Sequence, residues 1–407
     1  MVLANRSLPR LAIISTHPIQ YYAPIFQRLA QSARLQLRVF FTFSQAAHGP
    51  IADRGFGRNI TWDLPLLDGY AHEFVPNRAS RPGTDHFWGL RNPGLNRAID
   101  AWGATAVLVF GWNSASHLQA LRHFKGRIPV FFRGDSTLLD RGSPARRAAR
   151  RAFLGWVYRH IDVAIAVGAN NRDYFRWCGV PEQQIAYAPH AIDTKRFAHA
   201  DAAHNLQVAQ WRHQLGVPPG AKVILFAGKL IPKKAPELLL EAFLRSKVAA
   251  HLVFVGSGTL ESQLHRRAQG RATVHFLPFQ NQQLMPAVYR LGDVFVLPSC
   301  GPGETWGLAL NEAMACGRPV IASSKVGGAR DLVVPEHTGW MFESGDADAL
   351  ASRLTAACAG DAATLLRLGQ AARQRSELGS IECAAAGIEQ AILQSETRAP
   401  ASTVTGT

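Results

Sequence analysis

Short apolar runs alternate with helix-like segments along most of the chain. Runs of this kind occupy residues 11–15, 35–43, 106–110, 128–132, 161–167, 223–227, 251–256, 273–277 and 295–297. A strand that is apolar at successive positions is buried on both faces, as strands of parallel sheets are. Strand, loop, helix and strand in repetition predict an α/β fold with two doubly wound domains that face each other across a cleft.

The series divides at residues 198–216, an Ala-, Gln- and His-rich segment predicted to be a linking helix. We expect an N-terminal domain over residues 1–200 and a C-terminal domain over residues 201–375. The chain then has a helix over residues 376–396, a candidate for packing back on the N-terminal domain, and a disordered tail over residues 397–407.

Residues 44–95 are expected to be irregular, because they are rich in Gly, Pro, His and aromatic residues. Long loops inside compact domains are usually functional or mobile.

The stretch over residues 295–323 is predicted to form a strand, a loop, a helix and a second strand. Helix-forming residues run from about Thr305 to Cys316, with Glu304 at the mouth of the helix and Glu312 two turns inside it. A helix N-terminus binds anions through its unpaired N–H groups and its dipole. A carboxylate two turns further on suits a polyol such as ribose. The stretch therefore predicts a site for a sugar diphosphate that carries a nucleoside.

A second loop carries cations that suit the same ligand. Gly228 follows the strand over residues 223–227, and Lys229 and Lys234 come next. Lysines beyond a strand end, opposite a helix N-terminus, are able to clamp a diphosphate. Surface lysine pairs are common and usually solvated, so this pair gains meaning only beside the two glutamates.

The charge of the chain is concentrated in its first half. The 407 residues carry 44 Lys and Arg against 29 Asp and Glu, and residues 1–200 hold 25 of the former and 12 of the latter. Such a field suits a membrane surface, a phosphorylated lipid or a nucleic acid, and the alternative is an Arg-rich solvated surface. No recognition motif supports a nucleic acid.

Residues 141–160 are predicted to form a basic amphipathic helix. Its cations recur at helical spacing and its apolar side is partly aromatic: Arg146, Arg147, Arg150 and Arg151, then Phe153, Trp156 and Val157. One interpretation is an interfacial helix that contacts anionic lipid. The other is an ordinary surface helix that is packed by its aromatic face.

The five cysteines are scattered without metal-like spacing, which favours reduced thiols in a cytosol. No run of eighteen apolar residues occurs, so a transmembrane helix is not expected. The first apolar stretch lacks a small-residue cleavage site and is expected to be a core strand. We therefore expect a cytoplasmic protein, with peripheral binding to the inner face of the cell membrane as an option that the basic half leaves open.

Several segments together resemble the family-four retaining glycosyltransferases (glycosyl transferases group 1), which have the GT-B fold of two Rossmann-like domains facing across a cleft. The matching segments are FAGKLIPKKAPELLLEAF (226–243), VGSG (255–258), PSCGPGETWGLALNEAMACGRPVIAS (298–323), GGARDL (327–332) and TGW (338–340). The resemblance reaches the N-terminal half more weakly, at residues 15–30 and 187–197.

The resemblance implies roles for individual residues. Lys229 and Lys234 would hold the pyrophosphate, Glu304 would position the donor sugar, and Glu312 would bind ribose hydroxyls. The base would lie near residues 279–281. The implied donor-binding set, with backbone N–H groups acting at positions 306–308, is Gly228, Lys229, Lys234, Glu304, Thr305, Trp306, Gly307, Leu308 and Glu312.

The acceptor side departs from the family pattern. Arg133 and Asp135 lie in the loop where many relatives carry a catalytic His, and His17 lies where a Gly-Gly loop is usual. His117 and His190 have the simpler interpretation of buried, satisfied histidines. The candidate catalytic residues are Glu304, Lys229, Lys234, Asp135 and His17.

The implied reaction moves a sugar from a UDP- or GDP-sugar to a hydroxyl acceptor, lipid-linked or polysaccharide, in bacterial surface glycan assembly. Two lysines and a helix dipole are able to replace a divalent ion, so neither a metal nor a cofactor is expected. The alternatives are a sugar-nucleotide epimerase of the same fold, a non-catalytic nucleotide-sugar-binding protein at the membrane, and a basic nucleic-acid binder. The epimerase would need acid/base carboxylates at the N-terminal strand ends, where Asp135 is the one good candidate.

Overall fold

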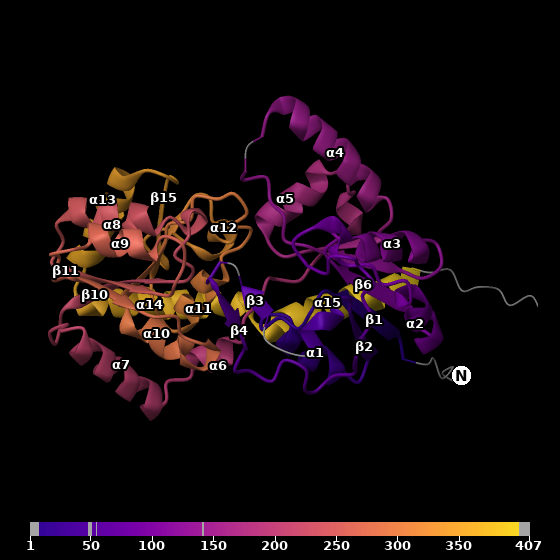
Figure 1. Cartoon of the computed structure of the whole chain (residues 1–407), viewed down its shortest axis with the longest axis horizontal. Coiled ribbons are helices and arrows are strands. Elements are labelled where there is room, and N and C mark those ends of the chain that lie inside the picture. The colour runs from indigo at the N-terminus through magenta and orange to yellow at the C-terminus, as the bar shows by residue number, and fades with distance from the viewer. Residues whose placement is uncertain (1–7, 48–50, 54, 141, 399–407) are drawn as a thin grey trace, which may run out of the picture.

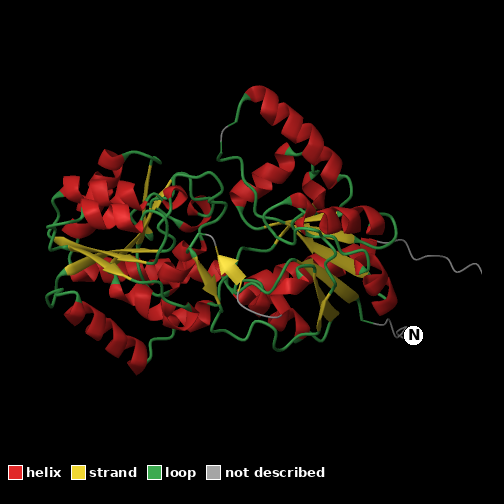
Figure 2. Ribbon diagram, viewed as in Figure 1, coloured by secondary structure: helices red, strands yellow, loops and turns green. Residues whose placement is uncertain are grey.

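The computed structural model describes residues 8–47, 51–53, 55–140 and 142–398, and it shows two α/β lobes side by side (Figure 1, Figure 2). The N-terminal lobe is built on a parallel sheet with the strand order β5-β2-β1-β6-β7-β8-β9. Its strands are β1 Arg10–Ser15, β2 Gln36–Phe41, β5 His72–Phe74, β6 Ala106–Phe110, β7 Val130–Arg133, β8 Val163–Ala166 and β9 Ile185–Tyr187.

The C-terminal lobe is built on a second parallel sheet, with the strand order β12-β11-β10-β13-β14-β15. Its strands are β10 Lys222–Ala227, β11 Ala250–Val255, β12 Val274–Leu277, β13 Val294–Leu297, β14 Val320–Ser323 and β15 Gly339–Phe342. The expected fold of two doubly wound α/β domains is therefore confirmed.

Helices cover both faces of each sheet (Figure 2). In the N-terminal lobe they are α1 Ala23–Ala30, α2 Leu95–Trp102, α3 Ala115–Phe124, α4 Pro144–Tyr158 and α5 Ala169–Trp177. The following helices are α6 Thr194–Ala198, α7 Ala202–Gln214, α8 Pro236–Ser246, α9 Glu261–Arg267, α10 Met285–Leu291, α11 Leu308–Ala315, α12 Ala329–Leu332, α13 Ala347–Ala359, α14 Ala362–Ser376 and α15 Ile381–Arg398.

Alternation along the central strands builds two cores in each lobe. In β10, Val223 and Leu225 belong to one buried cluster, whereas Ile224 and Phe226 belong to the cluster on the other face. Successive side chains of a strand point to opposite faces, so an unbroken apolar run feeds both cores. The reversal of strand order falls between β1 and β6 in one sheet and between β10 and β13 in the other. Ligands of open α/β sheets bind at such points.

The last helix, α15, returns to the N-terminal lobe (Figure 1). Its apolar stripe joins the core beneath β1, with Ile388 and Ile392 fully buried. Gly387 allows the close approach, because a Cβ at that position would lie 2.4 Å from the carbonyl oxygen of Tyr187 in β9. The expected tail over residues 397–407 lies almost entirely outside the described residues, although α15 itself is traced to Arg398.

Two local expectations were wrong. Residues 44–95 are not wholly irregular, since β5 extends the N-terminal sheet and β3 Ile51–Asp53 pairs antiparallel with β4 Arg58–Ile60. The helix after Glu304 begins at Leu308, three residues later than expected, because Gly307 adopts a left-handed conformation with φ +90°. Helix-forming composition alone does not reveal such a turn.

Helix α4 buries one side only. Leu154, Val157 and Tyr158 face the core, whereas Phe153 and Trp156 are 46% and 38% exposed. The apolar side expected at these positions is therefore divided: Val157 is packed, and the two aromatic rings contact each other at the surface with centroids 5.9 Å apart.

Truncation of Ile388 to Ala should test how strongly α15 holds the N-terminal lobe. We expect a loss of about 2–5 kcal/mol in the free energy of unfolding, because the fully buried side chain leaves a cavity. Leu366→Ala in α14 is the matched control, since Leu366 is 63% exposed. Urea denaturation measures the free energy of unfolding of both variants. Equal urea midpoints for the two variants would contradict the prediction.

Candidate active site

A cavity of about 440 Å³ lies between the lobes, beyond the carboxyl ends of β10 and β13. The loop after β10 supplies the lysines, and the loop after β13 supplies Glu304. Asp135 lines this cavity. So does the whole predicted donor-binding set: Gly228, Lys229, Lys234, Glu304, Thr305, Trp306, Gly307, Leu308 and Glu312. The volume is within the usual range for small-molecule sites.

Lys234 and Glu304 form an ion pair at the cavity wall. The Lys234 Nζ lies 2.7 Å from Oε2 of Glu304, and the side chains are 19% and 7% exposed. The hydroxyl of Ser299 donates to the same oxygen at 2.9 Å. Burial alone would raise the pKa of Glu304, but the attraction of Lys234 and the hydrogen bonds outweigh it, so the pKa lies below 4.5. Glu304 is therefore ionised at neutral pH.

Lys233, which the sequence analysis did not select, also lines the cavity. Its ammonium donates to the carbonyl of Gly303, on the loop that leads to Glu304. Burial lowers the pKa of Lys233, and the neighbouring lysines act in the same direction. Three lysines on one loop thus converge on a single hollow. Adjacent surface lysines in a sequence give no sign of which ones turn inward.

The start of α11 is held open toward the cavity by Gly307. A Cβ there would lie 2.6 Å from Cγ1 of Val326 and 2.9 Å from Cδ2 of Leu297. Glycine therefore meets both the left-handed backbone and the close packing at this turn. The N–H of Leu310 donates to the carbonyl of Gly307 at 2.8 Å. The N–H groups before it lie at the positive end of the helix dipole, and an end of this kind favours anions.

Glu312 lies deeper and is held by two tyrosines. Tyr289 donates to Oε2 at 2.5 Å, and Tyr21 of the N-terminal lobe donates to Oε1 at 3.1 Å. The carboxylate is 2% exposed. Burial raises the pKa of Glu312, although the tyrosine hydrogen bonds oppose this. Each oxygen keeps a second lone pair, so a polyol hydroxyl is able to share the site.

Trp306 packs at the contact between the two lobes. Its indole Nε1 donates to Oδ1 of Asn311 at 2.8 Å, and the side chain is buried. A Cβ on Gly168 of the N-terminal lobe would lie 2.3 Å from the indole, and one on Gly328 would lie 2.9 Å from it. The ring is therefore packed between two glycines, one from each lobe.

Asp135 projects from the end of β7 toward the donor site. Its Oδ2 accepts a hydrogen bond from the Thr305 hydroxyl at 2.7 Å. The same oxygen lies 4.0 Å from Nε2 of His190, which also lines the cavity. Burial lowers the pKa of His190 to about 4. The expectation of a satisfied histidine is wrong for His190, because Nδ1 is buried and has no hydrogen-bond partner among the described residues.

The structure places the other singled-out residues elsewhere. His17 is bonded to the Thr16 hydroxyl, packs on Phe43 and is absent from the described lining of the cavity. His117 is a satisfied core histidine, as expected, bonded to Thr42 and to main-chain carbonyls. Arg133 is a structural residue of the N-terminal lobe. Its buried guanidinium donates to the carbonyls of residues 188 and 189, both at 2.8 Å, and it is absent from the described lining of the cavity.

A smaller hollow of about 220 Å³ adjoins the donor cavity, and Asp135 lines both. Asn113, Asn171 and Arg150 contribute its polar surface. In the described residues no group of three or more His, Cys, Asp and Glu side chains is arranged to hold a metal ion.

Comparison with known proteins identifies this pair of α/β lobes, with its lysine- and glutamate-lined cavity, as the GT-B architecture of glycosyltransferases. Residues 207–375 match the family described as glycosyl transferases group 1, and residues 73–191 match the glycosyl transferase 4-like domain. The chain belongs to the group 1 glycosyltransferases.

Relatives and solved structures agree with this assignment. A D-inositol 3-phosphate glycosyltransferase of Geodermatophilus obscurus is 37% identical over 183 residues, covering 41% of this chain and 39% of that protein. The Streptomyces avermitilis protein of the same name is 28% identical over 384 residues, covering 88% and 78%. The crystal structure of Anabaena HepE in complex with UDP has a TM-score of 0.69 at 20% identity, covering 96% of this chain and 100% of that one, and it shows the shared fold.

Replacement of Lys234 by Met should leave Glu304 buried without its ion partner. We expect a loss of about 3–5 kcal/mol in the free energy of unfolding at pH 7. Much of it should return in the Lys234→Met/Glu304→Gln double variant, which removes the charge. Because the wild-type pKa of Glu304 is depressed, the stabilisation is present above pH 4.5 and is lost as the pH falls through the folded-state pKa.

Thermal unfolding at pH 7 and at acid pH measures both effects. Arg245→Met, which breaks exposed pairs with Glu241 and Asp348, is the control and should change the stability by less than about 1 kcal/mol. Equal losses in the single and double variants would contradict the pairing.

Proposed function

We propose that this chain is a retaining glycosyltransferase that moves a sugar from a UDP- or GDP-sugar to a hydroxyl acceptor, lipid-linked or polysaccharide, in bacterial surface glycan assembly. The observation that carries the proposal is the convergence of Lys229, Lys234, Glu304 and Glu312 with the open end of α11 on one cavity. The roles follow from position: the lysines and α11 hold the diphosphate, Glu304 orients the sugar, and Glu312 binds the ribose.

The reaction needs charge stabilisation above all. As the bond from the sugar to the diphosphate breaks, negative charge grows on the leaving phosphate, next to Lys229, Lys234 and the N–H groups of α11. Preorganised donors of this kind each contribute roughly 3–4 kcal/mol. The acceptor oxygen bonds to the anomeric carbon on the same face from which the diphosphate leaves, and the leaving phosphate takes the proton of the acceptor hydroxyl. Because attack and departure share one face, the anomeric configuration is retained.

The hollow that shares Asp135 with the donor cavity suits the acceptor. Its volume of about 220 Å³ fits one small ring, and Arg150 gives it a cation. Asp135 stands between the two hollows and is placed to orient the acceptor hydroxyl. Two relatives are named for D-inositol 3-phosphate, a small hydroxyl ring with an anionic group, which supports a reacting ring of this kind at the end of the acceptor.

The epimerase alternative receives less support. An epimerase needs two acid/base groups at the reacting carbons. Asp135 is one candidate, but another carboxylate at the cavity wall, Glu304, is paired with Lys234.

A panel of nucleotide sugars should reveal the donor. The correct donor at a hundred times its Kd adds about 2.7 kcal/mol to the stability, which appears as a rise in Tm. With that donor, Lys229→Met should lower kcat about 100-fold. Lys247→Met, an exposed lysine at the end of α8, is the control and keeps the wild-type rate. Unchanged turnover in Lys229→Met would contradict the assignment.

We also propose that the N-terminal lobe binds the inner face of the cell membrane through α4. This helix stands out from the lobe (Figure 1), and residues 146–153 on it are all exposed. Arginines beside exposed Phe153 and Trp156 combine attraction to anionic headgroups with shallow insertion. No helix in the described part of the chain is long and apolar enough to cross a membrane.

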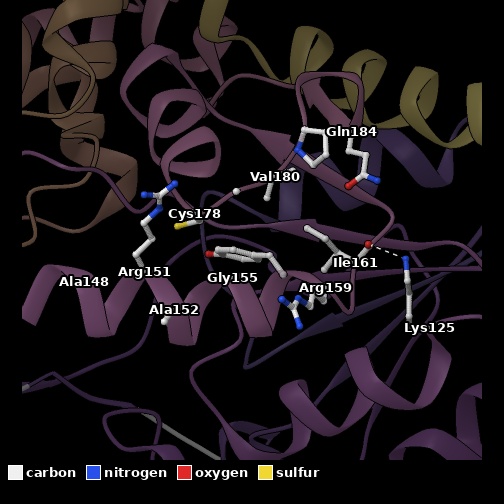
Figure 3. A pocket seen from close by; sticks show the side chains of 13 residues that line it. Lys125, Ala148, Arg151, Ala152, Gly155, Arg159, Ile161, Cys178, Val180 and Gln184 are labelled. Carbon is white, nitrogen blue, oxygen red and sulfur yellow. Dashed lines mark hydrogen bonds between the residues drawn. The ribbon is translucent and has the colours of Figure 1, made fainter.

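A hollow of about 700 Å³ lies against the same helix (Figure 3). It is larger than the donor cavity, but its described lining contains no carboxylate and therefore none of the chemistry above. Arg151 of α4 and Arg159, which follows the helix, line it together with Lys125, whose ammonium is bonded to the carbonyl of Ile161 and paired with Asp162. This basic and partly apolar hollow supports contact with anionic headgroups.

Vesicle co-sedimentation tests the membrane contact. Arg146→Ala/Arg147→Ala should weaken binding to phosphatidylglycerol-containing vesicles roughly 20- to 30-fold, at about 1 kcal/mol for each arginine. Arg367→Ala/Arg373→Ala on α14 removes the same charge from exposed positions in the other lobe and should leave binding unchanged. Equal binding by both double variants would contradict the proposal.

A further inference from the structure

A segment of the N-terminal lobe lies on the C-terminal lobe beside the donor cavity. We call residues 55–63 the strap. The carbonyl of Thr61 accepts a hydrogen bond from Nδ2 of Asn281 at 2.8 Å, and the carboxylate of Asp63 accepts one from the backbone N–H of Gln283 at 3.2 Å. Strands β3 and β4, which flank its turn, are seen at the junction of the lobes (Figure 1).

The turn of the strap carries Phe56 to two elements of the donor site. Its ring meets Phe279, with centroids 4.8 Å apart and planes at 69°. The Lys229 Nζ lies 5.0 Å from the centroid of the Phe56 ring. The Phe56 carbonyl also accepts from the Ser257 hydroxyl at 3.2 Å. One aromatic side chain of the N-terminal lobe thus touches both the diphosphate lysine and the aromatic residue after β12.

The strap forms a wall of the cavity and does not fill it. Phe56 and Trp62 are among the lining residues, and about 440 Å³ of space remains with both in place. This hollow is still large enough for a small-molecule ligand. Phe279 lies beyond the end of β12, the edge strand, whereas Glu304 lies beyond β13 on the far side of β10. The aromatic end is therefore separated from the sugar end.

An aromatic wall at that end suits a flat heterocycle. Stacking of a base on an aromatic side chain contributes roughly 1–3 kcal/mol, whichever base it is. The lysines and α11 account for the diphosphate and Glu312 for the ribose, so the remaining part of the donor is the base.

We propose that Phe56, together with Trp62, covers the nucleobase of the donor, so that nucleotide binding by the C-terminal lobe depends on an aromatic ring supplied by the N-terminal lobe. This inference rests on the proposed function. The hydrogen bonds at Asn281, Gln283 and Ser257 fix the strap, and they couple base binding to the contact between the lobes.

Calorimetric titration with UDP, GDP, ADP, CDP and TDP, and with inorganic pyrophosphate, tests the inference on the full chain. Phe56→Ala should weaken binding of the preferred nucleotide roughly tenfold, with less than about a twofold change for pyrophosphate. Phe56→Tyr should keep the wild-type affinity, because its ring is retained. Asp63→Ala, outside the cavity lining, should weaken the nucleotide severalfold by releasing the strap.

Two further variants serve as controls for the loss of a ring and for the loss of a carboxylate. Trp88→Ala removes an aromatic ring that is 65% exposed on the same lobe, and Asp68→Ala removes an exposed carboxylate near the strap; both should bind as the wild type does. Wild-type affinity in Phe56→Ala, tighter binding, or an equal loss for pyrophosphate would overturn the base cover and leave the proposed function intact. Failure of the wild type to bind every nucleotide would overturn the proposed function and the base cover with it.

Discussion

The structure of the site depends on one constraint, that two buried carboxylates must be compensated. Glu304 and Glu312 are 7% and 2% exposed, and an uncompensated buried charge costs several kcal/mol. Glu304 is compensated by Lys234 and Ser299, which fixes the loop after β10 against the loop after β13. Glu312 is compensated by Tyr289 and by Tyr21 of the other lobe. Satisfying these two carboxyl groups therefore sets both the shape of the donor cavity and part of the contact between the lobes.

Most of the fold was predictable from the sequence, because its signals are local. The apolar runs marked the central strands of both sheets, and the helix expected within residues 198–216 is α7. The errors have physical causes. Gly307 takes a left-handed conformation that delays α11, and β5 is a three-residue edge strand whose pattern is too short to recognise. Both features are fixed by tertiary packing.

The candidate site also has one part that the sequence predicts and one part that it does not. The donor half was predictable because its lysines and glutamates lie in two contiguous motifs, each after a strand at the switch point. The contributions of Tyr21, Phe56 and His190 were not, since each comes from the other lobe and meets the site only through folding. His17 shows the opposite error. A strand end that seems to face a cleft does not decide the direction of a side chain, and His17 turns to Thr16 and Phe43.

The two lobes contribute different kinds of side chain to the cavity. The C-terminal lobe supplies nearly all the charge, whereas the N-terminal lobe supplies a tyrosine to Glu312, Asp135 to Thr305, and the aromatic wall of the strap. Charge attracts a diphosphate at a distance, but it does not exclude water. Hydroxyls and aromatic rings act only at contact and remove solvent as they do so. A cleft whose cations come from one lobe and whose aromatic and hydroxyl walls come from the other shields a bound ligand from water. In the proposed reaction this lower polarity strengthens the action of the lysines on the leaving phosphate.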